Sequence, residues 1–252
     1  MPAAKTALIT GARRGIGFEI ATKLLGQGFA VVICDTDAEG VGKAVQSLDK
    51  SGQRVMGQCC DVRDEASVAS LIQAVEVKFG GIDVLVNNAG ISPKHNGKRA
   101  PVAQTDVSEW REVLDINLTG AFICSKLVLP HMKSARWGRI VNISSQAART
   151  ASMIAGAHYA ASKAGMLAMA RTLAAEVGPD GITVNCVAPG RIMTPMADEA
   201  GEQANAEYLK RIPVNRLGVP ADVANVVAFL VSEEASFLTG TVIDINGGSL
   251  MI

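Results

Sequence analysis

The sequence has little that would direct it to nucleic acid, to a membrane or to an export route. Basic and acidic residues balance at 24 each, and no basic run is long enough to follow a phosphate backbone. No continuous apolar run reaches the ~18 residues that a membrane span needs. The first ten residues lack the long apolar stretch and cleavage site of a secretory leader. We therefore expect a cytoplasmic protein with no nucleic-acid partner and no membrane partner.

Cysteines are few, and their spacing is not that of metal ligands. Most sit in apolar runs typical of strands and helices. Cys59 and Cys60 are adjacent, so their side chains should point to opposite faces of a strand. We expect reduced, mostly buried thiols and no metal site. The five are Cys34, Cys59, Cys60, Cys124 and Cys186.

Linkers rich in proline or serine and internal repeats are also missing. The 252 residues are 48% hydrophobic, with a mean hydropathy of +0.24, and a chain of this kind can bury a large core. We therefore expect one domain over residues 1–252.

Apolar runs of strand length alternate along the chain with segments of helical periodicity. Several runs are apolar almost throughout, as are parallel strands covered on both faces. Right-handed crossovers then give an α/β fold, a Rossmann-type, doubly wound, seven-stranded parallel sheet flanked by helices. The predicted strands are 5–10, 29–34, 54–60, 82–87, 138–144, 182–188 and 240–246, and the predicted helices lie near 15–27, 38–50, 65–79, 107–134, 158–177 and 221–231.

Tyr159 and Lys163 stand four residues apart on one face of a predicted helix. An ammonium beside a phenol should lower the pKa of the phenol and make it a usable proton donor and acceptor. Ser145, at the end of the preceding strand, could hydrogen-bond the oxygen whose proton Tyr159 handles. The pattern is short, so a tyrosine and a lysine on the wet face of an ordinary helix is the alternative.

A glycine-rich turn, TGARRGIG at 10–17, joins the first predicted strand to the first predicted helix. Such a turn brings backbone N–H groups and a helix N-terminus close to a pyrophosphate. Asp35 ends the next strand, where a carboxylate can accept both hydroxyls of an adenosine ribose. The alternative is a glycine-rich connection followed by a solvated aspartate.

Polar residues follow two more strands, at the edge where open α/β sheets bind ligands. Asp61 and Val62 come after the third strand, and 87–90 (NNAG) come after the fourth. Asn117 lies inside a long predicted helix, where asparagine is a mediocre helix former. Its alternative role is a local hydrogen bond to the backbone.

These residues resemble the short-chain dehydrogenase/reductase family, and the resemblance covers nearly the whole chain. Each matching piece is short, but the pieces follow one another in the family's order. They are TGARRGIG at 10–17, CDV at 60–62, NNAG at 87–90, Asn117, ISS at 143–145, YAASK at 159–163, VAPG at 187–190 and DINGG at 244–248.

The resemblance implies a catalytic tetrad. Ser145 would polarise the substrate carbonyl, and Tyr159 would exchange the proton. Lys163 would hold the nicotinamide ribose, and Asn117 would kink its helix and anchor a water that relays protons. Ser145 is favoured over Ser144 because the family's serine is the second residue after the last apolar position of the strand.

The resemblance also implies a set of cofactor contacts around the glycine-rich turn and the strand ends, and a mobile substrate loop at about 191–218. The implied cofactor-binding residues are Gly11, Arg14, Ile16, Gly17, Asp35, Asp61, Val62, Asn87, Ala89, Gly90, Tyr159, Lys163, Pro189, Gly190, Ile192 and Thr194.

Cofactor choice depends on opposing charges. Arg14 is the kind of residue that can meet the 2′-phosphate of NADP, whereas Asp35 would repel that phosphate. Thr36 and Asp37 follow Asp35, so no cation comes next. Two unit charges about 4 Å apart at a partly wet site interact by up to ~4 kcal/mol. We therefore expect NAD rather than NADP.

The substrate is expected to be a small polar molecule, with an anionic group as one option. Arg149 and Arg191 each lie a few residues past a strand end, where an arginine fork suits a carboxylate. His158 adjoins Tyr159 and could also line the substrate site. The segment after Gly90 is long and carries a basic group of residues at 94–99, which is either a wall of the entrance or a solvated loop. The arginines could instead pair with solvent or with neighbouring carboxylates such as Glu199 and Glu202.

Three functions remain open at this point. The favoured one is an NAD-dependent alcohol dehydrogenase or ketone reductase that transfers a hydride between the cofactor and its small-molecule substrate. The second is a 3-oxoacyl-[acyl-carrier-protein] reductase that uses NADPH. The third is a nucleotide-binding regulator without catalysis, although all four tetrad positions are filled.

We also expect a homotetramer. The helices at 107–134 and 158–177 carry more apolar or small residues than one sheet face needs, and the tail GGSLMI ends apolar. The residues concerned are Ala121, Phe122, Leu127, Val128, Met166, Met169, Ala170 and Leu173.

Overall fold

Seven parallel strands form one sheet in the order β3-β2-β1-β4-β5-β6-β7, as predicted. The structure, a computed structural model, describes residues 4–152, 154–194, 197 and 201–252. The strands are β1 Thr6–Thr10, β2 Ala30–Asp35, β3 Val55–Cys59, β4 Val84–Asn87, β5 Gly138–Ile143, β6 Ile182–Pro189 and β7 Val242–Ile245. Strands β2 and β3 lie on one side of β1, and β4 to β7 lie on its other side. The strand order therefore reverses between β1 and β4.

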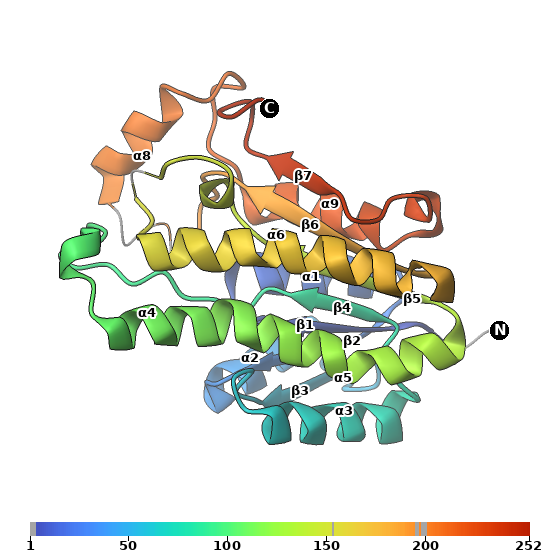
Figure 1. Cartoon of the computed structure of the whole chain (residues 1–252). Coiled ribbons are helices and arrows are strands. Elements are labelled where there is room, and N and C mark those ends of the chain that lie inside the picture. The colour runs from blue at the N-terminus through green and yellow to red at the C-terminus, as the bar shows by residue number, and fades with distance from the viewer. Residues whose placement is uncertain (1–3, 153, 195–196, 198–200) are drawn as a thin grey trace.

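Helices cover both faces of this sheet (Figure 1). Helices α1 Gly15–Gly26, α2 Ala38–Leu48 and α9 Pro220–Leu230 pack on one face, and α3 Glu65–Phe79, α5 Gly120–Ala135 and α6 Ala157–Val177 pack on the other. Along β1, Ala7 and Ile9 face the first layer and Leu8 faces the second. This alternation follows from the two-residue period of a strand, and burial on both faces explains the continuous apolar runs.

The long helix predicted at 107–134 is interrupted. It consists of α4 Val107–Leu114, a π-helical turn at Asp115–Thr119 and α5. A π-turn inside an α-helix frequently marks a functional site. By length and composition alone this helix could also cross a membrane, since its most apolar window has a mean hydropathy of 1.4. That finding corrects our expectation that no segment is long and apolar enough to span a membrane. A helix that covers a sheet meets the same test, however.

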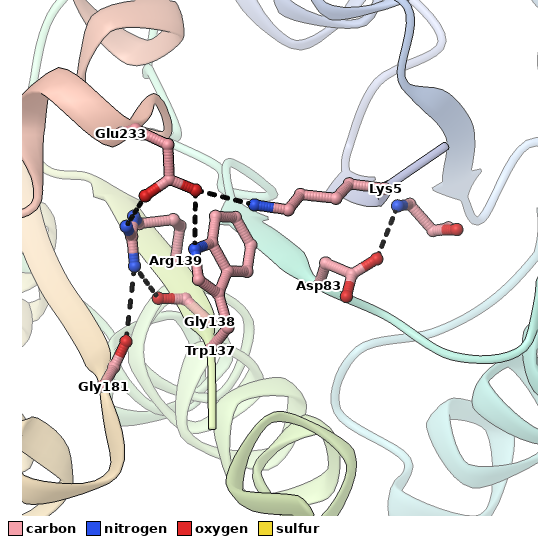
Figure 2. Close-up of polar contacts among 8 residues, drawn as sticks. Lys5, Asp83, Trp137, Gly138, Arg139, Gly181 and Glu233 are labelled. Carbon is pink, nitrogen blue, oxygen red and sulfur yellow. Dashed lines mark hydrogen bonds and ion pairs between the residues drawn. The ribbon is translucent and has the colours of Figure 1, made fainter. Parts of the chain in front are cut away.

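Polar contacts join the amino ends of the strands, at the edge opposite the strands' carboxyl ends (Figure 2). Glu233 accepts hydrogen bonds from Lys5 Nζ and from Trp137 Nε1, both at 2.9 Å, and from Arg139 Nη2 at 3.4 Å. Arg139 is buried and also donates to the carbonyl of Gly181 at 3.3 Å. The carboxylate of Glu233 thus connects the start of β1 to the start of β5, and Arg139 extends this connection to the start of β6.

The thiols agree with the expectation from the sequence. All five are free, and only Cys59 is exposed. Cys59, the last residue of β3, is exposed, whereas the adjacent Cys60 is buried. In the predicted loop at 191–218, the structure has α8 Gly201–Leu209, and residues 195–196 and 198–200 lie outside the described part. The mobility of this loop stays a prediction.

Candidate active site

A cavity of about 570 Å³ opens at the carboxyl edge of the sheet. In Figure 1 the strand arrowheads point toward it, at the end of the molecule where α4 and α8 lie. It begins at the reversal between β1 and β4, which is where doubly wound sheets bind ligands. Most of the predicted site residues line it: Gly11, Arg14, Ile16, Asp35, Asp61, Val62, Ala89, Gly90, Ser145, Tyr159, Lys163, Pro189, Gly190, Arg191, Ile192 and Thr194.

The glycine-rich turn leaves room for a ligand backbone close to the start of α1. Gly11 has φ +62°, and a Cβ at this position would lie 2.7 Å from Ala89 Cα, so no other residue fits without strain. Gly17 lies behind the cavity wall, where a Cβ would meet Ala12 Cα at 2.9 Å. Gly17 therefore permits close packing of the start of α1 on the turn and is not itself at the cavity. The donors at the start of α1 and the acid Asp35 beside them fit a dinucleotide.

Asn88, rather than Asn87, connects this turn to the end of β4. Its Nδ2 donates to the carbonyls of Thr10 and Gly11 at 2.8 and 2.9 Å. Asn87 is buried and donates to Asn142 Oδ1 at 2.8 Å, inside the sheet and away from the cavity. Asn87, predicted to line the ribose side of the cofactor, is not among the residues that line the cavity.

Tyr159, Lys163 and Ser145 meet at the cavity wall. Lys163 is buried, donates to the carbonyl of Ile143 at 2.7 Å and lies 5.7 Å from the centroid of the Tyr159 ring. Ser145 caps the short turn after β5, where its Oγ accepts from Ala147 N at 3.1 Å. Helix α6 and the end of β5 thus bring an acid/base pair and a hydroxyl to one place.

The electrostatics of this group differ from the expectation. Burial lowers the pKa of Lys163 to about 8. Burial also raises the pKa of Tyr159, and hydrogen bonding with Ser145 opposes that rise. In the chain by itself the pKa of Tyr159 therefore lies above its ordinary value, opposite to the predicted lowering, because desolvation of the buried phenol is the largest effect on it.

The two neighbouring serines have different roles. Ser144 is buried, and its Oγ donates to the backbone carbonyl of Lys163 at 2.9 Å, which fixes β5 to α6. Both serines line the cavity, but only the Ser145 hydroxyl hydrogen-bonds with Tyr159. This arrangement supports the choice of Ser145 as the residue that faces a substrate.

Asn117 lies at the centre of the π-helical turn and is fully buried. Its Oδ1 accepts from Ile91 N at 2.8 Å, and its Nδ2 donates to Ile91 O at 3.0 Å and to Ser162 Oγ at 3.1 Å. The hydrogen bonds are therefore to a distant segment, not local ones. A Cβ at Gly90 would approach Asn117 Oδ1 to 3.1 Å and Lys163 Nζ to 3.4 Å, so Gly90 makes room for both side chains.

Two residues predicted near the substrate lie outside the cavity. Arg149 forms an ion pair with Asp244 of β7. His158 is fully buried between α4 and α6, with Nε2 3.0 Å from Glu109 Oε1. Each has a partner inside the protein, so neither faces a ligand, and both assignments are corrected.

Arg191 and Lys94 do line the cavity. Arg191 donates to Asn205 Oδ1 at 2.8 Å and to the carbonyl of Ala197 at 2.6 Å. Lys94 donates to Ser92 Oγ at 2.9 Å. Glu199 and the side chain of Glu202, which the sequence suggested as arginine partners, lie outside the described residues.

Sequence reasoning missed two charged residues near the site. Arg13 Nε lies 3.3 Å from Asp35 Oδ1, and Arg13 Nη1 lies 3.2 Å from Asp37 Oδ2. Glu109 contacts two histidines. The only sequence signal near this contact is the Asn-Gly pair at 96–97, which is common in hairpin turns.

Comparison with known proteins agrees with this geometry. A sequence model described as "Enoyl-(Acyl carrier protein) reductase" matches residues 11–249. The BbsD subunit of (2S)-[(R)-hydroxy(phenyl)methyl]succinyl-CoA dehydrogenase from Thauera aromatica is 40% identical, with 97% of this chain and 96% of the relative covered. The cis-4-hydroxycyclohexanecarboxylate dehydrogenase of Sinomonas cyclohexanicum is also 40% identical, with 98% and 96% covered.

The solved structures agree as well. A 3-oxoacyl-[acyl-carrier protein] reductase with bound NAD from Brucella melitensis superimposes with a TM-score of 0.92 and 43% identity, covering 100% of this chain and 93% of that one. Fold and site thus define a nicotinamide-dependent oxidoreductase. The chain belongs to the short-chain dehydrogenase/reductase family, and it transfers a hydride between a nicotinamide cofactor and an alcohol or ketone.

Proposed function

We propose that this enzyme uses NAD and acts on a small polar alcohol or ketone that carries an anionic group. The observation that carries the proposal is one cavity that is lined by Tyr159 and Ser145 and also by two cations, Lys94 and Arg191. Two of the relatives are named for a carboxylate and for a CoA thioester, which supports an acidic substrate.

The residues of this chain divide the work. When bound, the nicotinamide supplies or accepts the hydride. Tyr159 gives or takes the proton at the substrate oxygen, and the Ser145 hydroxyl hydrogen-bonds the same oxygen. Lys163 lies beside Tyr159, and its positive charge favours the phenolate as that proton leaves. Asn117 holds the backbone of Ile91, a residue of the cavity lining, and also donates to Ser162 of α6, so it fixes these two segments to each other.

The preference for NAD rests on Asp35 at the end of β2. Asp35 lines the cavity, and its carboxylate can accept hydrogen bonds from both hydroxyls of the adenosine ribose of NAD, whereas NADP carries a phosphate on the 2′-oxygen. Arg13, the nearest cation, is already shared between Asp35 and Asp37. A 2′-phosphate would have to break those ion pairs to gain Arg13.

The second candidate is a 3-oxoacyl-[acyl-carrier-protein] reductase that uses NADPH. The likeness to the Brucella melitensis reductase favours the oxoacyl substrate but not NADPH, since that structure holds NAD, and Arg14 at the cavity favours NADPH. A screen of hydroxy acids, polyols, sugars and oxoacyl thioesters with each cofactor, followed by the absorbance of the reduced nicotinamide, separates the two. Higher kcat/KM for an oxoacyl thioester with NADPH would replace the first proposal.

We further propose that the chain assembles as a cytoplasmic homotetramer. Four of the residues expected to pair, Ala121, Val128, Met166 and Ala170, are buried in the chain's own core. Exposed apolar residues nonetheless remain on α4 and α5 and at the tail, since Trp110, Phe122, Met251 and Ile252 are exposed by 37%, 52%, 74% and 75%. Light scattering at micromolar concentration tests the proposal, and a monomer would contradict it.

A further inference from the structure

One carboxylate, Glu109 in the first turn of α4, contacts two histidines from different segments. Glu109 Oε2 lies 2.7 Å from His95 Nε2, and Oε1 lies 3.0 Å from His158 Nε2. The Glu109 side chain is only 17% exposed, His158 is 1% exposed and His95 is 56% exposed. The bridge therefore runs from the protein interior to the surface.

Each histidine adjoins a residue of the active-site cavity. His158 directly precedes Tyr159 in the first turn of α6. His95 directly follows Lys94, which lines the cavity together with Ile91 and Ser92. Glu109 thus connects the catalytic helix to the segment 91–98, which forms another wall.

The direction of the His158 hydrogen bond follows from burial. Among the residues that the structure describes, His158 Nδ1 has no hydrogen-bond partner and is shielded from water. A proton on Nδ1 would be left without an acceptor, which is costly, so the ring carries its proton on Nε2 and donates it to Glu109. His158 thus binds one carboxylate oxygen of Glu109 from the protein interior, and the other oxygen is left to contact His95.

The segment that carries His95 is shaped by a tight turn. His95 and Lys98 exchange backbone hydrogen bonds of 2.7 and 3.1 Å, and Asn96 and Gly97 between them have φ values of +52° and +75°. Two positive φ values define the two-residue turn that favours Asn-Gly in hairpins. This short hairpin projects His95 toward α4. Apart from its contact with Glu109, the His95 side chain is largely solvated.

We propose that Glu109 is a positioning residue that holds the segment 91–98 as a wall of the substrate cavity. The inference rests on the proposed function for its kinetic consequence. It assigns a role to the long basic segment after β4, because the bridge keeps Lys94 at the cavity and couples its position to Tyr159. If the segment 91–98 were a solvated loop without such a role, its position would not depend on a carboxylate in α4.

The first experiment does not need a substrate. Lys94, Lys98 and Arg99 are trypsin sites inside this segment, so cleavage after them, read by mass spectrometry on the folded protein, reports its opening. His95→Ala and Glu109→Ala should speed cleavage at these sites about tenfold, as expected when a charge-assisted hydrogen bond is lost. Asp106→Asn is the matched control, because Asp106 is exposed at the start of α4 and its side chain does not cap the helix. Wild-type cleavage rates in both alanine variants would overturn the proposal.

The second experiment separates positioning from a general structural effect. His95→Ala breaks only the outer arm and should raise the substrate KM about tenfold, with smaller changes in kcat and in the cofactor KM. Glu109→Ala should also lower kcat, since it frees His158 beside Tyr159. Glu109→Gln keeps one acceptor oxygen and should restore part of the wild-type KM. A fall in kcat without a rise in KM for His95→Ala would overturn the proposal. Absence of turnover in the wild type would instead refute the proposed function, while the trypsin result still decides the role of Glu109.

Discussion

Arg13 and Asp35 form an ion pair across the cofactor end of the cavity, with Arg13 Nε 3.3 Å from Asp35 Oδ1. The arginine comes from the glycine-rich turn and the aspartate from the end of β2. The two elements that would contact the adenosine are therefore joined by opposite charges before any ligand binds. The charge of Asp35 is partly compensated, which weakens its repulsion of a 2′-phosphate.

This pair predicts opposite effects of two substitutions. Asp35→Asn removes the ribose acceptor and releases Arg13, so the ratio of kcat/KM for NAD over NADP should fall about tenfold or more. Arg13→Ala leaves Asp35 and Asp37 uncompensated, so the same ratio should rise. Steady-state kinetics with both cofactors, supported by calorimetric binding of each, measures the two shifts. A change in the same direction for both variants would contradict this reading of the site.

The second prediction concerns the two groups that contact the substrate oxygen. Tyr159→Phe should lower kcat by about 10²–10⁴-fold because a positioned acid/base is lost, while cofactor affinity stays within a few-fold. Ser145→Ala should also lose most turnover. Ser144→Ala is the comparison, since its hydroxyl contacts the Lys163 carbonyl and its loss should cost about 1 kcal/mol of stability but little kcat. Equal losses of kcat for the two serines would reject the assignment.

The third prediction follows from the pKa of Lys163, which burial lowers from 10.5 to about 8. Between these values the unfolded chain binds the proton and the folded chain does not, so stability should rise with pH across that window. Relative to Lys163→Met, the wild type should gain roughly 2–3 kcal/mol in free energy of unfolding between pH 7 and pH 10. Urea unfolding at several pH values measures the difference, with Lys50→Met as an exposed control. A constant difference between wild type and Lys163→Met would show that Lys163 is not desolvated.

The fourth prediction concerns Glu233 at the opposite edge of the sheet (Figure 2). Its pKa is lowered, chiefly by the hydrogen bond from Lys5, and its contact with buried Arg139 makes the carboxylate structurally important. Because the Glu233 side chain is 67% exposed, solvent screens these contacts, and Glu233→Gln should lower the free energy of unfolding by only about 0.5–1 kcal/mol at pH 7. A lowered pKa means that this stabilisation is present above the ordinary value of 4.5 and is lost as pH falls further. The difference from wild type should therefore shrink at acid pH, whereas Glu76→Gln on the exposed face of α3 should have little effect at either pH.

The fifth prediction tests the anionic substrate. Arg191→Met and Lys94→Met should each lower kcat/KM for an anionic substrate by about 1.5–3 kcal/mol, because each removes a charged hydrogen-bond donor from the cavity. Arg149→Met should leave that value near wild type, since Arg149 is paired with Asp244. A neutral analogue of the substrate should respond to none of the three. Equal sensitivity of the neutral analogue would mean that the cations shape the cavity rather than bind a charge.

Much of the fold could be predicted because its signals are local. The predicted strands and helices agree with the structure to within about two residues at most boundaries, since apolar runs and helical periodicity report burial directly. The break at Asn117 was expected only through the family resemblance. Its cause, a π-turn whose asparagine holds Ile91, involves residues far apart in the sequence.

By itself the sequence determined the doubly wound sheet, the glycine-rich turn and the acid/base pair of Tyr159 and Lys163, because each depends on spacing along one strand or helix. Only the tertiary structure decided which charged residues face the cavity. Arg149 and His158 are within a few residues of the site in sequence, yet Asp244 and Glu109 draw them elsewhere. The direction of the Tyr159 pKa shift was decided in the same way, since burial by surrounding segments raises it and hydrogen bonding with Ser145 opposes that rise. Partner choice and desolvation arise from residues distant in sequence, and no local pattern encodes them.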